Sequence, residues 1–373
     1  MLEPIVNFVT RIFQWIGRGI GWILSLLLWP FLWLGRWYVA RGWILRSVVG
    51  VFLVLLVALY GYFIYATQAW TGFNPDYIDT YRYEARNVSA GEQVTASGGT
   101  DTSRTCGRSA IADVAADLTN YNVNENAWIS SMILYKLGFF GIDWDHTPFL
   151  DNKASFQRGI NQAVRRTTTE LADNLGRVRT TSQIDGDHQD ARGNMQFDEE
   201  TWYFGLNPFG PKTPTPSYYR DAITKLRSFN DRLQNCQAVF DARSDNLKNY
   251  LDRIASDIGS TSALLKDRAE NYNAGFFDLR ADDRFWFAYG QLYAYYGFIK
   301  AAEADFEDVI KQRNLASLWQ TMDAQFASAL KVQPMIIANS REAGLFASHL
   351  TTMGFYILRV RSNMVEISNV LAQ

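Results

Sequence analysis

The sequence predicts an all-α protein, in which an antiparallel helical bundle outside the membrane follows one N-terminal transmembrane helix and a preceding interfacial amphipathic helix. Two observations carry this prediction. Residues 47–66 (SVVGVFLVLLVALYGYFIYA) contain no charged side chain and are numerous enough to cross a hydrocarbon core of about 30 Å as a helix. After residue 109, apolar residues recur every three or four positions along successive segments, which is the period of helices that pack in a bundle.

Residues 1–46 form a Trp-rich amphipathic segment that we expect to lie at the membrane interface. On a helical wheel the polar residues between positions 7 and 25 share one narrow stripe, and indoles lie near its edge, where their N–H groups can reach lipid headgroups. We interpret residues 4–29 as an interfacial helix that Pro30 bends or ends. The alternative makes residues 19–34 the first short span of a helical hairpin. The residues that we place at the interface are Arg11, Trp15, Arg18, Trp22, Trp29, Trp33, Arg36 and Trp37.

The charge distribution sets the expected topology and partners. Five arginines against one glutamate give residues 1–46 a charge of +4, which leaves −6 for the rest of the chain. Basic residues beside a span stay preferentially in the cytoplasm, so we expect the chain beyond residue 66 to lie outside it. The anchor should remain uncleaved, because the apolar region begins too late for a signal peptide. An acidic outer domain argues against nucleic acid as a partner, whereas the basic segment suits anionic lipid.

Two cysteines, Cys106 and Cys236, lie in the part that we place outside the cytoplasm. In an oxidising compartment such residues can form a disulfide. The alternative is two separate buried thiols, since the sequence does not reveal whether the two Cα atoms approach within bonding range.

The chain beyond the span divides into two expected regions. Residues 67–108 are interpreted as a stalk and polar loop, with a short strand or extended stalk over 77–86 and small polar residues thereafter. Residues 109–373 are interpreted as an extracytoplasmic helical domain with an acidic loop at 180–198 and a proline-rich connection at 207–217. Helical periodicity is found over residues 109–120, 125–137, 160–178, 218–242, 247–265, 283–313, 315–331 and 342–371.

Five stretches carry a resemblance to a known family: FDEETW (197–202), YYRDAITKLRSFNDRL (218–233), FDARSDNLKNYLDRIASDIGS (240–260), FIKAAEADFEDVI (298–310) and LFASHLTTMGFYILRVRSNMVEISNVL (345–371). Over this region the chain resembles an uncharacterised family of proteobacterial membrane-anchored proteins, known as a domain of unknown function. The resemblance implies one N-terminal span and a helical extracytoplasmic region, and it implies no activity. With the charge distribution, it indicates a single-pass protein of the bacterial inner membrane with its C-terminal domain in the periplasm. The long Trp-rich segment departs from the shorter N-termini of the family.

Histidine, the usual catalytic base, occurs three times. His349 shares the apolar face of the last predicted helix, so we interpret it as a hydrogen-bonded core residue, and His146 follows acidic residues that a turn and a helix cap explain. His188 lies in the stretch DGDHQDARGN, whose spacing does not match a calcium loop and which we interpret as a solvated loop. Phosphate-loop, nucleophile-elbow, HExxH and CxxC motifs are absent from the sequence. We therefore expect no catalytic residue, no cofactor and no metal site.

An aromatic run, FWFAYGQLYAYYGFIK, covers residues 285–300. Its rings occupy more than one face of the predicted helix, so they cannot all contact one neighbour. Core packing, a subunit interface and a groove for an apolar ligand are the three interpretations. The residues concerned are Phe285, Trp286, Tyr289, Tyr293 and Tyr296.

From the amphipathic segment and the missing catalytic motifs, we expect a non-enzymatic membrane-anchored scaffold that self-assembles at the bacterial inner membrane and organises envelope or membrane shape. Its partners would be membrane lipid, further copies of the chain and other envelope proteins. The alternative is a periplasmic binder of lipid or another apolar ligand that uses residues 285–300. An enzyme of unknown type would need His188 or His349 in a cleft beside paired carboxylates.

Overall fold

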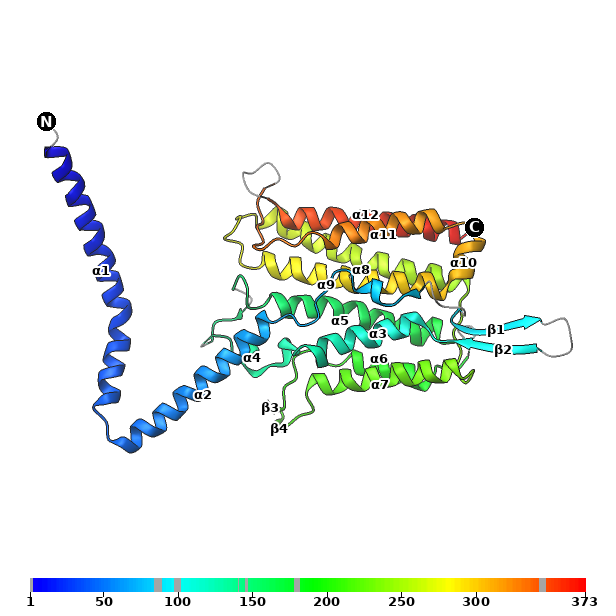
Figure 1. The fold of residues 1–373 in the computed structure, drawn as a ribbon, viewed down its shortest axis with the longest axis horizontal. Coiled ribbons are helices and arrows are strands. Elements are labelled where there is room, and N and C mark those ends of the chain that lie inside the picture. Colours follow the sequence, from blue (N-terminus) through cyan, green and yellow to red (C-terminus); the bar gives the residue numbers. More distant parts are fainter. Residues whose placement is uncertain are drawn as a thin grey trace. The chain divides into compact units, whose positions relative to one another are not determined.

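The computed structural model describes residues 3–83, 89–96, 102–139, 141–144, 147–177, 182–341 and 347–373. It divides into two compact units, Met1–Tyr62 and Phe63–Gln373, and we call the second unit the helical domain. Helices dominate both units, and the strands form two short hairpins (Figure 1). The predicted all-α fold class is confirmed.

The first unit consists of helix α1, Glu3–Val39, and most of helix α2, Trp43–Gln68. Helix α1 does not end at Pro30, which lies inside it and removes one backbone donor from the helical hydrogen bonds. Helix α2 has 26 residues and is long and apolar enough to cross a membrane. It begins earlier than the predicted 47–66. Tyr38 Oη donates to the Arg46 carbonyl at 2.9 Å, which closes the short connection between the helices.

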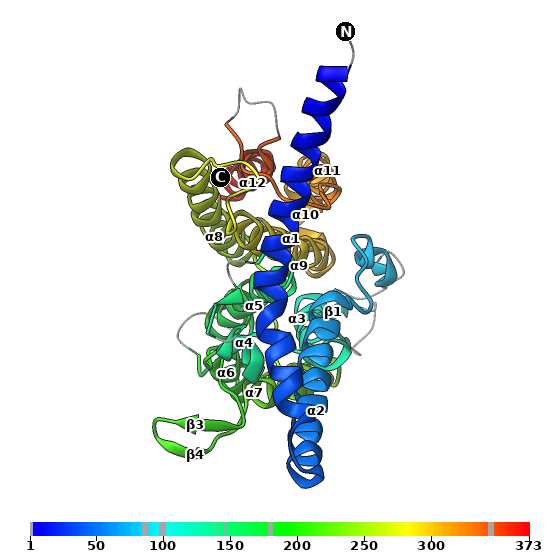
Figure 2. The ribbon, with the colours of Figure 1, turned by 90° about the vertical axis from the view of Figure 1, so that its left-hand side faces the viewer.

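In the residues that the structure describes, the helical domain is an antiparallel bundle of eight longer helices (Figure 1). Figures 1 and 2 show α5 and α9 side by side in the middle, with α3, α6 and α7 on the side of α5 and α8, α11 and α12 on the side of α9. The bounds are α3 Ala110–Asn120, α5 Asn152–Glu170, α6 Gly186–Met195, α7 Thr215–Gln234, α8 Ser244–Asn271, α9 Ala281–Asp305, α11 Ala316–Leu330 and α12 His349–Leu371. Two short helices, α4 Ile133–Leu137 and α10 Glu307–Gln312, lie in the connections.

The two central helices touch through their backbones. A Cβ atom built on Gly159 of α5 would lie 2.1 Å from the Phe287 carbonyl oxygen, and one built on Gly290 of α9 would lie 2.1 Å from the Phe156 carbonyl oxygen. Each glycine therefore faces the main chain of the other helix, a spacing that no side chain can occupy. This reciprocal contact sets the distance between α5 and α9.

Buried carboxylates join helices that are distant in sequence. Asp257 on α8 accepts hydrogen bonds from Gln291 Nε2 at 2.6 Å, Tyr295 Oη at 2.7 Å and Gln162 Nε2 at 3.0 Å, so it links α8 to both α9 and α5. Asp305, at the end of α9, accepts from the backbone N–H of Ala110 at 2.7 Å. A carboxylate at this position accepts from free backbone donors at the start of α3, and its negative charge interacts favourably with the positive end of the helix dipole.

The segment expected as a stalk and polar loop has more structure than predicted. Residues Tyr77–Thr80 form a 3-10 turn, η1, with Ile78 buried. Strands β1, Gly91–Ala96, and β2, Thr102–Gly107, pair antiparallel with Glu92 opposite Cys106. Small polar residues are compatible with a hairpin because its backbone hydrogen bonds need no apolar side chains. The prediction of a loop is wrong for residues 91–96 and 102–107, and residues 84–88 and 97–101 lie outside the described residues.

Several predicted helices differ in their bounds, and the one predicted over 160–178 begins at Asn152 and ends in a π-turn, Leu171–Leu175. Residues 125–137 do not form one helix. A π-turn that follows α3, Tyr121–Glu125, ends where Asn126 adopts an extended backbone, and a 3-10 turn, Ile129–Ser131, and α4 come after it. Helix α7 begins at Thr215 rather than after Ser217, since proline is tolerated in the first turn of a helix. The helix predicted over 283–313 divides at Phe306 into α9 and α10.

Two further predictions concern the loops. The acidic stretch at 180–198 is not a loop throughout, because residues 186–195 form α6, whose N-cap Asp185 accepts from the backbone N–H of Asp187 at 3.0 Å. The proline-rich connection contains a second hairpin, β3 Phe204–Leu206 and β4 Phe209–Pro211. The last helix begins at His349, and residues 342–346 of its predicted range lie outside the described residues.

The close contact of α5 and α9 predicts a large effect of one methyl group. We expect Gly159→Ala to lower the free energy of unfolding by at least about 2 kcal/mol, because the helices must separate or distort. Gly193→Ala is the matched control, since a Cβ there meets nothing within 4 Å, and it should be neutral or slightly stabilising. Urea unfolding followed by circular dichroism measures both, and equal stability of the two variants would contradict the prediction.

Candidate functional site

The end of α2 is built into the helical domain. Phe63, Ala66 and Thr67 are buried, and the Phe63 ring packs on Trp144 with 5.0 Å between ring centroids. Gln68 Nε2 donates to the Phe149 carbonyl at 2.8 Å. We call this end of the helical domain, where residues 63–68 are held, the anchor end.

Lys153, near the start of α5, caps the end of α2. Its side chain is almost completely buried, and Nζ donates to the carbonyl oxygens of Ala66 at 2.9 Å and Ala69 at 2.6 Å. Carbonyls at a helix C-terminus lack intrahelical partners, and a cation is favoured there by the helix dipole. Burial lowers the pKa of Lys153 to about 8. The ammonium group thus connects the apolar helix to the first residues of a central helix.

The chain after α2 packs its rings against α9. Trp70 lies 5.0 Å from Trp286 between ring centroids, and Phe73 stacks on Tyr293 at 5.9 Å. Tyr77 stacks on Tyr293 at 4.4 Å, and its hydroxyl donates to the Tyr293 carbonyl at 3.0 Å. Phe156 of α5 completes the cluster, 5.0 Å from Trp70. Consequently the aromatic run is where the segment following the span is held.

The structure places every predicted aromatic site residue against rings of the same chain. Phe285, Tyr289, Tyr293 and Tyr296 are buried, and Trp286 is half-buried. Tyr296 lies on another face of α9 and stacks on Phe326 of α11 at 5.4 Å. Two faces of the helix are therefore occupied by different neighbours, which explains why the run has no single apolar stripe.

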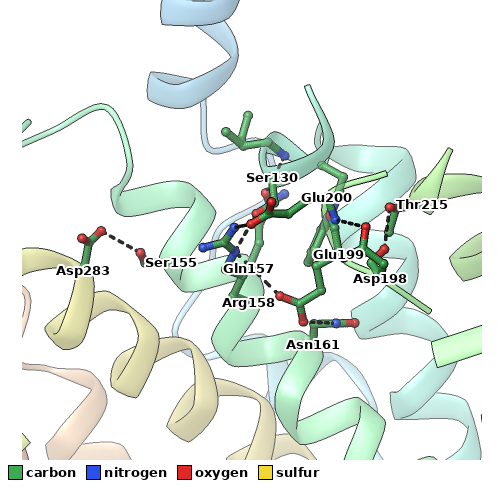
Figure 3. A network of polar contacts seen from close by, with 12 residues as sticks. Ser130, Ser155, Gln157, Arg158, Asn161, Asp198, Glu199, Glu200, Thr215 and Asp283 are labelled. Carbon is green, nitrogen blue, oxygen red and sulfur yellow. Dashed lines mark hydrogen bonds and ion pairs between the residues drawn. The ribbon is translucent and has the colours of Figure 1, made fainter. Parts of the chain in front are cut away.

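Arg158 on α5 lies at the centre of a polar network at the anchor end (Figure 3). Its Nε donates to Ser130 Oγ at 2.9 Å, and its Nη2 donates to Glu200 Oε1 at 2.8 Å. Beside it, Asn161 Nδ2 donates to Glu199 Oε1 at 2.8 Å. These contacts join the connection before α5, through Ser130, and the connection after α6, through the two glutamates, to α5. The two glutamates belong to the FDEETW stretch, whose acidic residues thus have structural partners.

The residues predicted at the membrane interface all lie on α1. Among its indoles, Trp15 is 75% exposed and Trp37 is 37% exposed, with the other three between these values. Arg11, Arg18 and Arg36 are exposed as well. The tryptophans thus present apolar surface that a soluble helix would bury.

The two cysteines are joined at the other end of the helical domain. Cys106 of β2 and Cys236, in the turn after α7, form a disulfide with 5.5 Å between Cα atoms. Cys236 has a φ of +56°, the left-handed conformation common after a helix end. The bond ties the β1–β2 hairpin to the bundle.

The histidines do not form a catalytic arrangement among the described residues. His349 Nδ1 accepts from the backbone N–H of Ala338 at 2.9 Å. His188 is fully buried rather than solvated, packs on Phe229 at 3.7 Å between ring centroids, and has no hydrogen-bond partner among the residues described. The neighbouring acids Asp185 and Asp187 both contact Arg232 at 2.7 Å. His146 lies outside the described residues.

No group of three or more possible metal ligands occurs within the described ranges. An open hollow of about 500 Å³ lies between the end of α8 and the start of α9. Of its three charged lining residues, Arg268 and Asp278 are paired with each other, Asp278 also accepts from Asn339 Nδ2 at 2.7 Å, and Arg280 is exposed. Nearby, burial and the adjacent Asp283 raise the pKa of Asp282 to about 7. These groups stabilise the connections and are not arranged around a reacting atom.

Sequence reasoning missed Lys153 and the rings of Trp70 and Phe73. The signal for the rings was present, since two aromatic residues follow the span directly in the stretch WTGF. Lys153 carries no comparable signal, because a lysine in a polar stretch before a helix is usually solvated.

Fold and site together define a helical-bundle protein with one N-terminal helix that is long and apolar enough to span a membrane. The chain belongs to an uncharacterised protein family conserved in bacteria (DUF2333), whose model matches residues 43–276 and 277–373. The predicted membership of an uncharacterised family is confirmed, and the match begins at the first residue of α2 and leaves α1 outside. No curated protein and no solved structure matches the chain.

The Lys153 cap predicts a local change in dynamics. Lys153→Met keeps the apolar stem but removes the donors, so the Ala66 and Ala69 carbonyls lose a partner at a cost of about 1–3 kcal/mol. We expect faster hydrogen exchange in peptides covering residues 63–77. Lys266→Met is the control, because the Lys266 side chain is 72% exposed. Unchanged exchange in Lys153→Met would show that the cap does not hold the segment.

Buried His188 predicts acid sensitivity. Burial lowers its pKa from 6.5 to about 4, so between these values the unfolded chain binds the proton more tightly and stability falls as pH falls. From this residue alone we expect about 2 kcal/mol less stability at pH 5 than at pH 7. His188→Leu should remove this difference in urea unfolding, whereas His349→Leu should retain most of it. The same pH dependence in wild type and His188→Leu would contradict the assignment.

Proposed function

We propose that this protein is a non-enzymatic membrane-anchored scaffold, which self-assembles at the bacterial inner membrane and organises envelope or membrane shape. The observation that carries the proposal is α1, a helix of 37 residues with exposed indoles and arginines. Helix α2 alone would suffice to anchor the helical domain, so anchoring does not explain why the chain also carries α1.

The dimensions and chemistry of α1 suit a helix lying in one membrane leaflet. Its residues span about 55 Å at 1.5 Å per residue. Tryptophan bodies enter the acyl boundary while arginines meet anionic headgroups. Many such helices side by side would occupy area in one leaflet only, which favours curvature.

The proposed periplasmic position of the helical domain rests on charge and on the disulfide. Residues 1–46 carry five arginines, which favours a cytoplasmic position for that side of the span. The Cys106–Cys236 bond is of the kind that persists in oxidising compartments such as the bacterial periplasm.

A non-enzymatic role is supported by how the domain uses its charged groups. Asp257, Asp305, Arg158 and Lys153 each contact helices or connections remote in sequence. Groups engaged in this way hold the fold and are not available to a substrate.

The last helix offers a surface for self-assembly. On α12, Phe355 and Leu358 are 53% and 51% exposed, and Val365 is 39% exposed. Their spacing of three and seven residues places them along one face, which a second copy could cover. The alternative of an apolar-ligand binder at residues 285–300 has no comparable support, because those rings pack against rings of the chain itself.

The proposal is tested by mass measurement of the detergent-extracted full chain, using light scattering over a range of concentrations. We expect multimers, and we expect a chain that begins at residue 41 and keeps α2 to form smaller assemblies. Leu358→Glu should also reduce the assembly, whereas Leu264→Glu, exposed on α8, serves as a control of equal chemistry. A monomer at all concentrations, with or without residues 1–40, would overturn the proposal.

A further inference from the structure

The antiparallel topology gathers four connections at the anchor end. These are the connections after α3, α6, α8 and α11, at residues 121–151, 196–214, 272–280 and 331–348. Trp128 Nε1 donates to the Glu199 carbonyl at 2.7 Å, which joins the first two. A bridge between Gly275 and Asn339 joins the last two. Ser155 Oγ donates to Asp283 Oδ1 at 2.9 Å between the starts of α5 and α9, so the two pairs share one end of the bundle.

All four connections expose large apolar side chains. Phe139 and Ile142 are 50% and 61% exposed in the first, and Phe209 is 80% exposed at the tip of the β3–β4 hairpin. Phe277 is 87% exposed in the third and Met335 is 90% exposed in the fourth. Water-exposed apolar residues gathered on one end of a domain indicate contact with an apolar partner.

The opposite end differs. In the described parts of the connections after α5, α7 and α9, the large apolar residue that is exposed is Val239. Exposure of apolar rings is therefore a property of the anchor end and not of the connections in general.

Exposed basic residues accompany the rings. Lys136 adjoins Leu137 and Phe139, Arg280 follows Phe277 and Leu279, and Arg341 lies in the fourth connection, while Asp143, Asp198 and Glu200 are also exposed at this end. Aromatic and aliphatic side chains beside lysine and arginine are the composition of protein surfaces that enter the headgroup region of an anionic bilayer.

The identity of the partner follows from chain continuity. Residues 63–68, the end of α2, are held at the anchor end by Lys153 and Gln68. Since α2 is long and apolar enough to span a membrane, a bilayer that it crosses would have its surface within a few residues of this end. Because α2 keeps the anchor end next to the lipid, a protein partner would have to compete with lipid for this surface.

We propose that the anchor end lies on the bilayer that α2 enters, with the apolar side chains of its four connections inserted in the headgroup region. The bundle helices then stand away from the membrane, and the disulfide end lies farthest from it. The inference concerns the orientation of each copy and does not depend on self-assembly.

The test uses the full chain with one added cysteine that carries a polarity-sensitive fluorophore, attached under non-reducing conditions so that the native disulfide stays intact. Phe209→Cys and Phe277→Cys report on the anchor end, and Val239→Cys is the matched control at the opposite end. The samples are vesicles of phosphatidylethanolamine and phosphatidylglycerol with a large excess of lipid. Quenching is measured with spin-labelled lipid and with aqueous iodide. Quenching of the fluorophore at residue 239 by iodide added outside the vesicles shows that the helical domain lies on the outer side of the membrane.

We expect spin-labelled lipid to quench positions 209 and 277 several-fold more than position 239, and iodide to show the reverse. Equal iodide quenching at all three positions would overturn the proposal, since the anchor end would then be in water. Protection of 209 and 277 from both quenchers would also overturn it, because a second copy would then cover the surface. If the mass measurement finds only monomers while spin-labelled lipid still quenches positions 209 and 277, the scaffold proposal is overturned. The orientation proposed here is then still supported.

Discussion

The backbone contact between Gly159 and Gly290 is the constraint on which the rest of the helical domain depends. Because each Cβ position is occupied by the main chain of the other helix, α5 and α9 have one separation at their crossing. Lys153 and Phe156 of α5, and Trp286 and Tyr293 of α9, then face the same space. The segment after the span fits between them, so the attachment of the domain to its anchor follows from the packing of its centre.

Polar contacts in the domain serve the same purpose as the apolar ones. Asp257 joins three helices, Asp305 caps α3 from the end of α9, and Arg158 holds the connections before α5 and after α6. Buried carboxylates and guanidinium groups are costly unless their hydrogen bonds are satisfied, and here the partners come from distant parts of the chain. These contacts hold the domain together at the end where residues 63–68 are bound.

Patterns that depend on near neighbours along the chain were predictable. The apolar residues of α8 keep their helical period from Leu247 to Leu265, as the sequence predicted. Predictions failed where the composition of a segment suggests one structure and contacts with distant residues select another. The acidic stretch around His188 reads as a solvated loop, yet Arg232 and Lys225 of α7 neutralise its carboxylates, which allows α6 to form and bury the imidazole.

The sequence by itself determined the apolar span, the amphipathic α1 and the helical class of the remainder, because these depend on residue type and on periods of a few residues. The tertiary structure alone decided which rings the aromatic run contacts, that Lys153 caps α2, that Cys106 meets Cys236, and that four exposed connections share one end. Each of these joins residues tens to hundreds of positions apart. Such contacts arise only when the glycine crossing and the antiparallel topology select the neighbours of each helix.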